Sequence, residues 1–124
     1  MAEIKDSGER RQFYDAEGKE IAVRDCATGK GRNDLMPLNA VMELSKHCED
    51  GAIKYGEHNV DRGVPFHSLA DSAMRHLMKY MLGWDDENHI RAAAWNIMWL
   101  LEETVTKPEL NDLYGWKDKL NKGE

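Results

Sequence analysis

Hydrophobic residues recur at helical spacing along three stretches of the chain, and a glycine or a polar run follows each stretch. The first stretch predicts a helix over residues 37–55 that ends at Gly56, because glycine is a common stop at helix C-termini. At about 100° per residue, its apolar side is predicted to comprise Leu38, Val41, Ser45, Cys48, Ala52 and Tyr55.

Two further helices follow with similar patterns. One is predicted from residue 66 or 68 to 82, before Gly83. The next is predicted to begin within residues 85–87, where acidic side chains favour a helix N-terminus, and to end near Thr104. The apolar positions of these two helices are Phe66, Ala70, Ala73, Leu77 and Tyr80, then Ile90, Ala93, Ile97, Leu100 and Leu101. Pro108 is expected to begin a last helix that extends to Leu120.

The first part of the chain is different, because residues 1–34 are polar and rich in turn formers. Residues 12–14 and 20–24 flank a segment with Gly18 and predict a short β-hairpin. We therefore expect an all-α fold, a bundle of three to four helices over residues 35–124. Residues 1–34 are expected to form an arm or hairpin packed on this single domain.

Length, charge and hydropathy narrow the functional classes. A chain of 124 residues with 41% hydrophobic and 32% charged residues is typical of one globular domain. Its net charge of -6 argues against a nucleic-acid partner, because phosphate neutralisation needs a basic surface. No apolar run follows Met1 or reaches the roughly 20 residues of a membrane span, so we expect a cytoplasmic protein with no membrane partner.

Neither Cys26 nor Cys48 belongs to a CxxC pair, which indicates reduced thiols.

Candidate chemistry in the first helix centres on Glu49. On an ideal helix it lies beside Met42 and Ile53, at the edge of the buried side, where a carboxylate must be paired or hold a metal. A salt bridge and a metal site explain this position equally well. The solvated face opposite the apolar side is predicted to carry Glu43, Asp50 and Lys54.

The third helix gives the sharper signal. Asp86 and His89 are three residues apart, and both align with the inward positions, as does Asn96 seven residues after His89. One such residue alone is explained by an N-terminal cap, a core histidine or a buried amide. The three together favour a functional site.

The second helix carries Asp71, Arg75 and Lys79 at four-residue steps, with His76 at the boundary of its apolar side. This pattern is typical of a surface ion pair, and alternatively of a phosphate clamp if that face is turned into the bundle. The sequence has no phosphate-binding G-x-x-x-x-G-K-[ST] loop, no H-E-x-x-H zinc motif and no His-Asp dipeptide. We therefore expect any chemistry to depend on carboxylates and a metal ion.

Several strings resemble those of one known family. They are ERRQF (9–13), VRD (23–25), GKGRNDLMP (29–37), EDGAIKYG (49–56), Asn59, Gly63, DSAMRH (71–76) and DENHIRAAAWN (86–96). In order and spacing they are similar to the phage and bacterial dATP/dGTP diphosphohydrolases, over about residues 9–103. The resemblance implies an all-α, MazG-like nucleotide pyrophosphohydrolase that binds Mg²⁺ through carboxylates on its helices and releases pyrophosphate from a nucleoside triphosphate.

Combined with the inward polar positions, the resemblance assigns roles. Glu49, Asp86 and His89 are the expected catalytic and metal-binding residues, with Mg²⁺ as cofactor and Mn²⁺ as a substitute. The expected substrate-binding residues are Lys54, Asn59, Arg75, His76, Lys79 and Asn96. The substrate is expected to be a purine deoxynucleoside triphosphate. A homo-oligomer is also implied, with Trp84, Trp99 and Trp116 as interface anchors.

One alternative comes from another class of protein. MazG-like enzymes carry a dense E-E-x-x-E on one helix and E-x-x-D on another, and this chain does not have them in that form. A non-catalytic helical module that binds a nucleotide or a protein partner is therefore the alternative to an enzyme.

Overall fold

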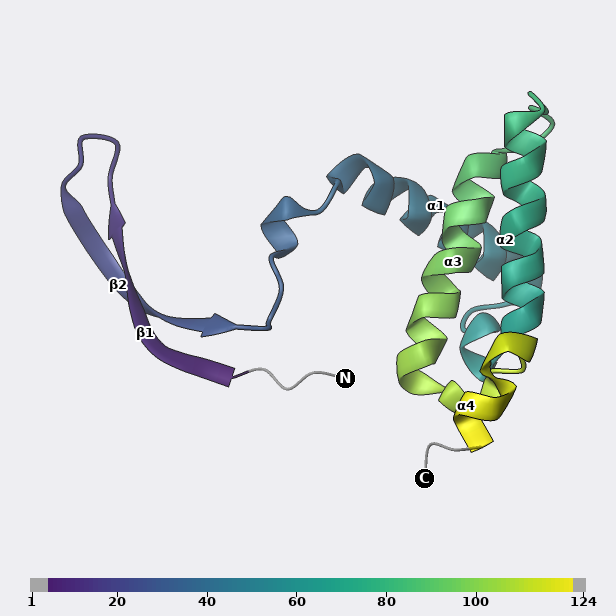
Figure 1. Cartoon of the computed structure of the whole chain (residues 1–124). Coiled ribbons are helices and arrows are strands. Elements are labelled where there is room, and N and C mark those ends of the chain that lie inside the picture. Colours follow the sequence, from purple (N-terminus) through teal and green to yellow (C-terminus); the bar gives the residue numbers. More distant parts are fainter. Residues whose placement is uncertain (1–4, 122–124) are drawn as a thin grey trace. The chain divides into compact units, whose positions relative to one another are not determined.

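The computed structural model describes residues 5–121 and divides the chain into two compact units (Figure 1). The first unit ends at Met36 and the second begins at Pro37. None of the described helices is both long and apolar enough to cross a membrane.

The first unit is a β-hairpin followed by a single 3-10 turn, η1 (Asn33–Leu35). Strands β1 (Lys5–Tyr14) and β2 (Glu20–Thr28) pair in antiparallel fashion, with two register shifts along the ladder. Asp15 shapes the turn, because its Oδ1 accepts hydrogen bonds from the backbone N–H groups of Glu17 and Lys19, both at 2.9 Å. The predicted hairpin is confirmed. Its strands are longer than expected, since the flanking residues are polar and give no period-two apolar pattern.

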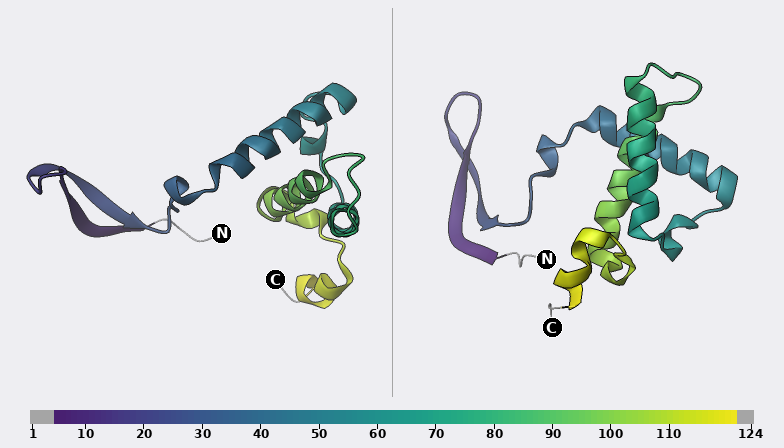
Figure 2. Two further views of the ribbon diagram at one scale, coloured as in Figure 1. Left: turned by 90° about the horizontal axis from the view of Figure 1, so that it is seen from above. Right: turned by 45° about the vertical axis from the view of Figure 1, so that its right-hand side comes forward.

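The second unit contains the four α-helices, so the all-α prediction is confirmed. The helices are α1 (Leu38–Tyr55), α2 (Phe66–Met81), α3 (His89–Thr106) and α4 (Lys117–Asn121). Three 3-10 turns lie between them: η2 (Val60–Arg62), η3 (Pro108–Leu110) and η4 (Tyr114–Trp116). Helices α2 and α3 run side by side, and α1 crosses this pair (Figure 2).

The buried core lies between α2 and α3. Phe66, Leu69 and Ala73 of α2 are buried, as are Ala92 and Ala93 of α3. Alanine at two successive positions lets the two backbones approach closely, because it adds little volume to the interface. Three polar residues of α3 are buried at the same time: His89, Asn96 and Glu103.

The predicted apolar side of α1 is wrong. No residue of α1 is buried, and Leu38 and Tyr55 are 64% and 66% exposed. The less exposed positions are instead Glu43, Leu44, His47, Gly51 and Ala52, of which only Ala52 was on the predicted side. The spacing of apolar residues did not predict the side of α1 that contacts α3, because α1 meets α3 through polar and aromatic side chains rather than through aliphatic ones.

Two boundaries also differ from prediction. Helix α3 begins at His89 rather than within residues 85–87, because the Asn88 side chain accepts the backbone N–H of Arg91 at 3.0 Å and so caps the helix. The continuous last helix from Pro108 to Leu120 is wrong. After η3, the Asn111 side chain accepts the backbone N–H of Leu113 at 3.1 Å, and this local bond competes with a helical turn.

Candidate functional site

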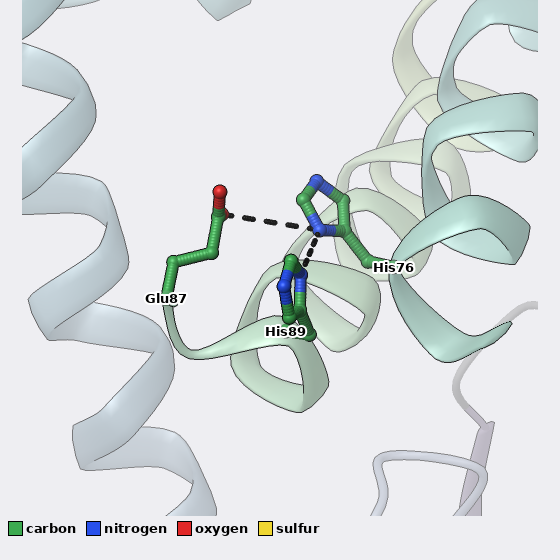
Figure 3. Close-up of side chains that lie close together, drawn as sticks. All are labelled: His76, Glu87 and His89. Carbon is green, nitrogen blue, oxygen red and sulfur yellow. Dashed lines mark hydrogen bonds and ion pairs between the residues drawn. The ribbon is translucent and has the colours of Figure 1, made fainter. Parts of the chain in front are cut away.

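Two histidines and the carboxylate of Glu87 lie close together where α2 passes the start of α3 (Figure 3), and the carboxylate of Asp86 pairs with one of the histidines. His89 is 1% exposed, and each of its ring nitrogens has a partner. Nδ1 lies 2.9 Å from Nδ1 of His76 on α2, and Nε2 lies 2.7 Å from Oδ1 of Asp86. Oε1 of Glu87 lies 3.9 Å from Nδ1 of His76. The structure thus brings together three residues expected in the site, namely His76, Asp86 and His89, and adds Glu87.

The surroundings of this cluster shift the protonation of its members. Burial lowers the pKa of His76 because it disfavours the charged imidazolium, although the Glu87 carboxylate opposes this effect. The hydrogen bond from His89 lowers the pKa of Asp86. Asp86 itself has a side chain that is 64% exposed, so its predicted place on the inward stripe is wrong. It lies before the first turn of α3 and reaches back to His89.

Lys79 lies beside the same cluster. Its Nζ is 5.3 Å from the centre of the Trp84 ring, and that ring faces His89 edge-on at 6.4 Å. The Lys79 charge contributes to the lowered pKa of both His76 and Asp86. A cation is therefore present at the rim of the histidine cluster.

Arg91 connects α3 to α1. Its guanidinium donates to Oδ2 of Asp50 at 2.8 Å and to Oε1 of Glu43 at 3.4 Å, and its Nε donates to Nδ1 of His47 at 3.4 Å. The predicted solvated face is correct in part: the side chains of Glu43 and Asp50 are 43% and 61% exposed, but both also pair with Arg91 of α3. Burial lowers the pKa of His47, and the charge of Arg91 lowers it further.

A cavity of ≈ 470 Å³ lies between α1, the loop that follows it, and α3. The residues that line it are Cys48, Glu49, Gly51, Ala52, Tyr55, Gly56, Glu57, His58, Asn59, Val60, Asp61, Trp95 and Trp99. This volume is within the range of small-molecule sites, which is roughly 300–1,000 Å³. Glu49 and Asn59, two of the predicted site residues, thus line the cavity rather than the histidine cluster.

Trp95 joins the cavity to the polar residues of α1. Its indole Nε1 lies 3.4 Å from Sγ of Cys48, and its ring is 5.2 Å from the His47 ring and 6.2 Å from the Trp99 ring. The cavity and the group around Arg91 are therefore neighbours. We use "polar seam" for the polar residues where α1 meets α3, together with the histidine cluster: Glu43, His47, Asp50, His76, Asp86, Glu87, His89 and Arg91.

The remaining predicted residues lie elsewhere or have internal partners. Lys54 is exposed, with its Nζ 5.6 Å from the centre of the Tyr55 ring. Arg75 pairs with Asp71 along the exposed side of α2. Asn96 is buried, and its amide nitrogen donates to the carbonyl of Ala92 in its own helix at 2.8 Å. Glu49 is exposed, so its predicted position at the edge of the buried side is also wrong.

Sequence reasoning missed Glu103, which is 2% exposed. Its Oε1 accepts the backbone N–H of Val64 at 2.7 Å, so it fastens the segment before α2 to the end of α3. A signal was available, because His89, Asn96 and Glu103 recur every seven residues and therefore share one helix face. The sequence did not indicate a role for Arg91 or His47, because polar residues at single helical positions are common on protein surfaces.

Comparison with known protein families gives a match over most of the chain. A family model described as dATP/dGTP diphosphohydrolase, N-terminal, matches residues 21–113, which include all of α1, α2 and α3. The comparisons with curated proteins and with solved structures gave no match.

Proposed function

The chain belongs to the dATP/dGTP diphosphohydrolase family, and from this premise we propose that it hydrolyses purine deoxynucleoside triphosphates to a deoxynucleoside monophosphate and pyrophosphate, with Mg²⁺ as cofactor. The observation that carries the proposal is the position of the aromatic-lined cavity beside the polar seam. One end of a nucleotide is a flat apolar base and the other is a chain of phosphates, so its site needs both environments side by side.

The base is proposed to bind in the cavity. Trp95, Trp99 and Tyr55 offer flat surfaces, and stacking of a base on an aromatic side chain contributes about 1–3 kcal/mol. Asn59 lies on the cavity wall, where an amide can donate to and accept from a base edge or a sugar hydroxyl. The family description names two purine nucleotides, which supports a purine substrate.

The triphosphate is proposed to extend from the cavity along the polar seam. Arg91 in the seam and Lys79 beside the histidine cluster are the proposed phosphate-binding cations, and a guanidinium binds phosphate in bidentate fashion. His89 has partners on both ring nitrogens, so its proposed role is to hold Asp86 in position.

The carboxylates around the seam fit Mg²⁺, which prefers oxygen ligands and commonly takes one or two carboxylates plus substrate phosphates. Glu49 and Asp86 are the proposed ligands, because both are exposed and each lies beside one part of the proposed substrate site. When bound, Mg²⁺ would neutralise charge on the phosphate oxygens and polarise the α-phosphorus. In the proposed reaction, a water oxygen bonds to the α-phosphorus, the bond from that phosphorus to the β-bridging oxygen breaks, and a carboxylate such as Asp50 accepts the water proton.

The experiment is a pyrophosphate-release assay with each of the four dNTPs and the four NTPs, with Mg²⁺, with Mn²⁺ and with a chelator. We expect release from dATP and dGTP, and none with the chelator. Glu49→Gln and Asp86→Asn should each lower kcat on the order of 100-fold, whereas Glu109→Gln, an exposed carboxylate in η3, should leave it unchanged. A wild-type protein that releases no pyrophosphate from any of the eight nucleotides would overturn the proposal.

One observation favours a non-catalytic binding module as the second candidate. Arg91 already compensates both Glu43 and Asp50, so two carboxylates of the seam are paired without a metal ion. This module would bind the same nucleotides without metal and without turnover. A rise in Tm with dGTP that a chelator does not diminish, together with unchanged dGTP after prolonged incubation, would distinguish it from the enzyme.

We also propose that the helical unit forms a homo-oligomer. Helix α1 exposes Leu38, Val41, Met42, Ile53 and Tyr55, and apolar side chains gathered on one helix commonly mark an interface. Light scattering after size exclusion should give a mass above 14.2 kDa. A monomeric mass at micromolar concentration would contradict this proposal.

A further inference from the structure

We propose that His76, Glu87 and His89 form a binding site for one divalent transition-metal ion, with Asp86 orienting His89. This ion is additional to the Mg²⁺ proposed to accompany the substrate. Asp86 is shared with the proposed Mg²⁺ site, whereas His76, Glu87 and His89 are not proposed as Mg²⁺ ligands, so metal binding without nucleotide tests this site separately.

The three side chains converge on one point. Each of the three offers one ligand atom, and these three atoms all lie within 4.8 Å of one another. All three belong to the described residues 5–121. They come from separate positions, the middle of α2, the segment before α3, and the first residue of α3. In Figure 3 the contacts from Glu87 and His89 meet at the same ring nitrogen of His76.

The spacing of the nitrogens indicates the geometry of the site. Two nitrogens bound at about 2.1 Å to one ion lie about 3.0 Å apart at a right angle and about 3.4 Å apart in a tetrahedron. The observed separation of 2.9 Å between the two Nδ1 atoms agrees with adjacent positions of a six-coordinate ion. Two imidazoles and one carboxylate on one face of an octahedron are a recurrent ligand set, with the other positions open.

Asp86 prepares His89 for this role. When Nε2–H of His89 donates to Oδ1 of Asp86 at 2.7 Å, the lone pair of the neutral ring is at Nδ1, which faces His76. A carboxylate that holds the far nitrogen of a histidine is the usual support of a metal-bound imidazole. In the absence of an ion, a proton between the two Nδ1 atoms forms a hydrogen bond between the histidines. A bound ion would displace that proton.

A hydrogen bond between His76 and His89 does not by itself explain the position of Glu87. At 3.9 Å its carboxylate is too far from His76 to share a hydrogen bond, yet it directs its charge at the nitrogen where the histidines meet. Side-chain exposure of 20% for His76 and 54% for Glu87 leaves this side open to solvent, so an ion can enter.

The ligand set defines the class of ion. Imidazole nitrogen suits Fe²⁺, Ni²⁺, Cu²⁺ and Zn²⁺, and the stability order places Co²⁺ between iron and nickel. Mg²⁺ prefers oxygen ligands and should not occupy a site with two imidazoles. We therefore expect Co²⁺, Ni²⁺ and Zn²⁺ to bind in the presence of excess Mg²⁺.

The experiment uses the full chain without a histidine tag, cleared of metal with a chelator and free of nucleotide. Titration with Co²⁺, Ni²⁺ or Zn²⁺ in a large excess of Mg²⁺, followed by calorimetry, should show one tight site per chain. A visible Co²⁺ spectrum of weak bands supports six-coordination, whereas intense bands would overturn the six-coordinate assignment.

Variants locate the site. Asp86→Asn should weaken binding roughly 10–100-fold, as expected for a residue that supports a ligand, while His76→Gln and Glu87→Gln should weaken it more. His76 and Glu87 are accessible enough to tolerate substitution, and a far-UV circular dichroism spectrum checks that each variant folds.

The matched controls His58→Gln and Glu109→Gln lie outside the group and should bind the metal ion as tightly as wild type. Unchanged affinity in folded His76→Gln and Glu87→Gln, or displacement of the ion by Mg²⁺, would overturn the proposal. Because no nucleotide is present, the result does not depend on whether the chain hydrolyses dNTPs.

Discussion

Helix α1 and the α2–α3 pair belong to the same helical unit, but different contacts hold them there. The pair encloses the buried apolar residues, and Glu103 fastens the segment before α2 to α3. Helix α1 buries none of its residues and meets α3 through Arg91 and through the aromatic contact between His47 and Trp95. Apolar burial dominates folding energetics, while exposed ion pairs contribute little. The comparison therefore indicates a stable scaffold with a weakly held helix over it, and the candidate site lies between them.

The largest expected effect is in the core of the pair. Leu69→Ala removes a buried side chain between α2 and α3, and we expect the free energy of unfolding to fall by about 3 kcal/mol. Val41→Ala on α1 is the matched change at a half-exposed position and should cost less than about 1 kcal/mol. Chemical denaturation of both variants measures the difference, and equal losses would contradict the comparison.

Substituting alanine for glycine should give opposite signs in the two regions. Gly63, before α2, has φ 108°, and a Cβ there would lie 2.8 Å from Cδ1 of Leu110. We expect Gly63→Ala to destabilise the unit by about 2 kcal/mol, because a strained backbone and a close contact add. Gly51 is within α1 with no atom near its Cβ position, so Gly51→Ala should stabilise by about 0.5–1 kcal/mol. Thermal unfolding of the pair of variants gives both signs, and a loss of stability in both would indicate that α1 is packed as tightly as the pair.

A smaller effect is expected from removing the polar link. Arg91→Met should lower the free energy of unfolding by roughly 1 kcal/mol or less, because its carboxylate partners are largely exposed. Amide hydrogen exchange should nevertheless become faster within α1 and remain unchanged at Leu69 and Ala73 of α2. Arg75→Met is the control, since Arg75 pairs within its own helix. Faster exchange throughout α2 and α3 would show that Arg91 stabilises the pair itself.

The smallest effect is expected at the C-terminal end of the scaffold, and it depends on pH. Asp112 accepts the backbone N–H of His67 at 2.9 Å and also pairs with its ring, and these bonds lower the pKa of the carboxyl group. A lowered pKa in the folded state gives stability that is present above the unfolded value of about 3.9. That stability is lost as pH falls through the folded pKa. The Tm advantage of wild type over Asp112→Asn should therefore shrink as pH falls below about 4. An advantage that grows as pH falls would contradict this assignment.

The two regions also differ in how well the sequence predicted them. The bounds of α1 and α2 agreed within a residue or two because Gly56 and Gly83 end the periodic stretches. The buried side of α2 was partly predicted, since Phe66 and Ala73 are indeed buried, although Leu77 and Tyr80 are exposed. For α1 the contact face was misassigned, because its partners across the seam are charged and aromatic, and periodicity counts only apolar positions.

The candidate site was predictable in part. His89 was identified from its inward position, and Asp86 from its three-residue spacing to His89, which the observed hydrogen bond agrees with. The link from His89 to His76 joins two helices, so spacing within one helix cannot predict it. Glu87 reaches His76 of α2, and Arg91 reaches Glu43, His47 and Asp50 of α1, so both links join separate helices and the sequence spacing within one helix could not predict them.

Hydrogen exchange with a bound substrate analogue tests most directly whether function lies between α1 and the pair. The analogue is dGTP with a methylene group in place of the oxygen that joins the α- and β-phosphates, added with Mg²⁺. We expect slower amide exchange in residues 47–61 and 86–99, which carry the cavity and the start of α3, and little change in residues 5–28 and 108–121. Protection confined to the hairpin or to the C-terminal turns, with none in residues 47–61, would contradict the account.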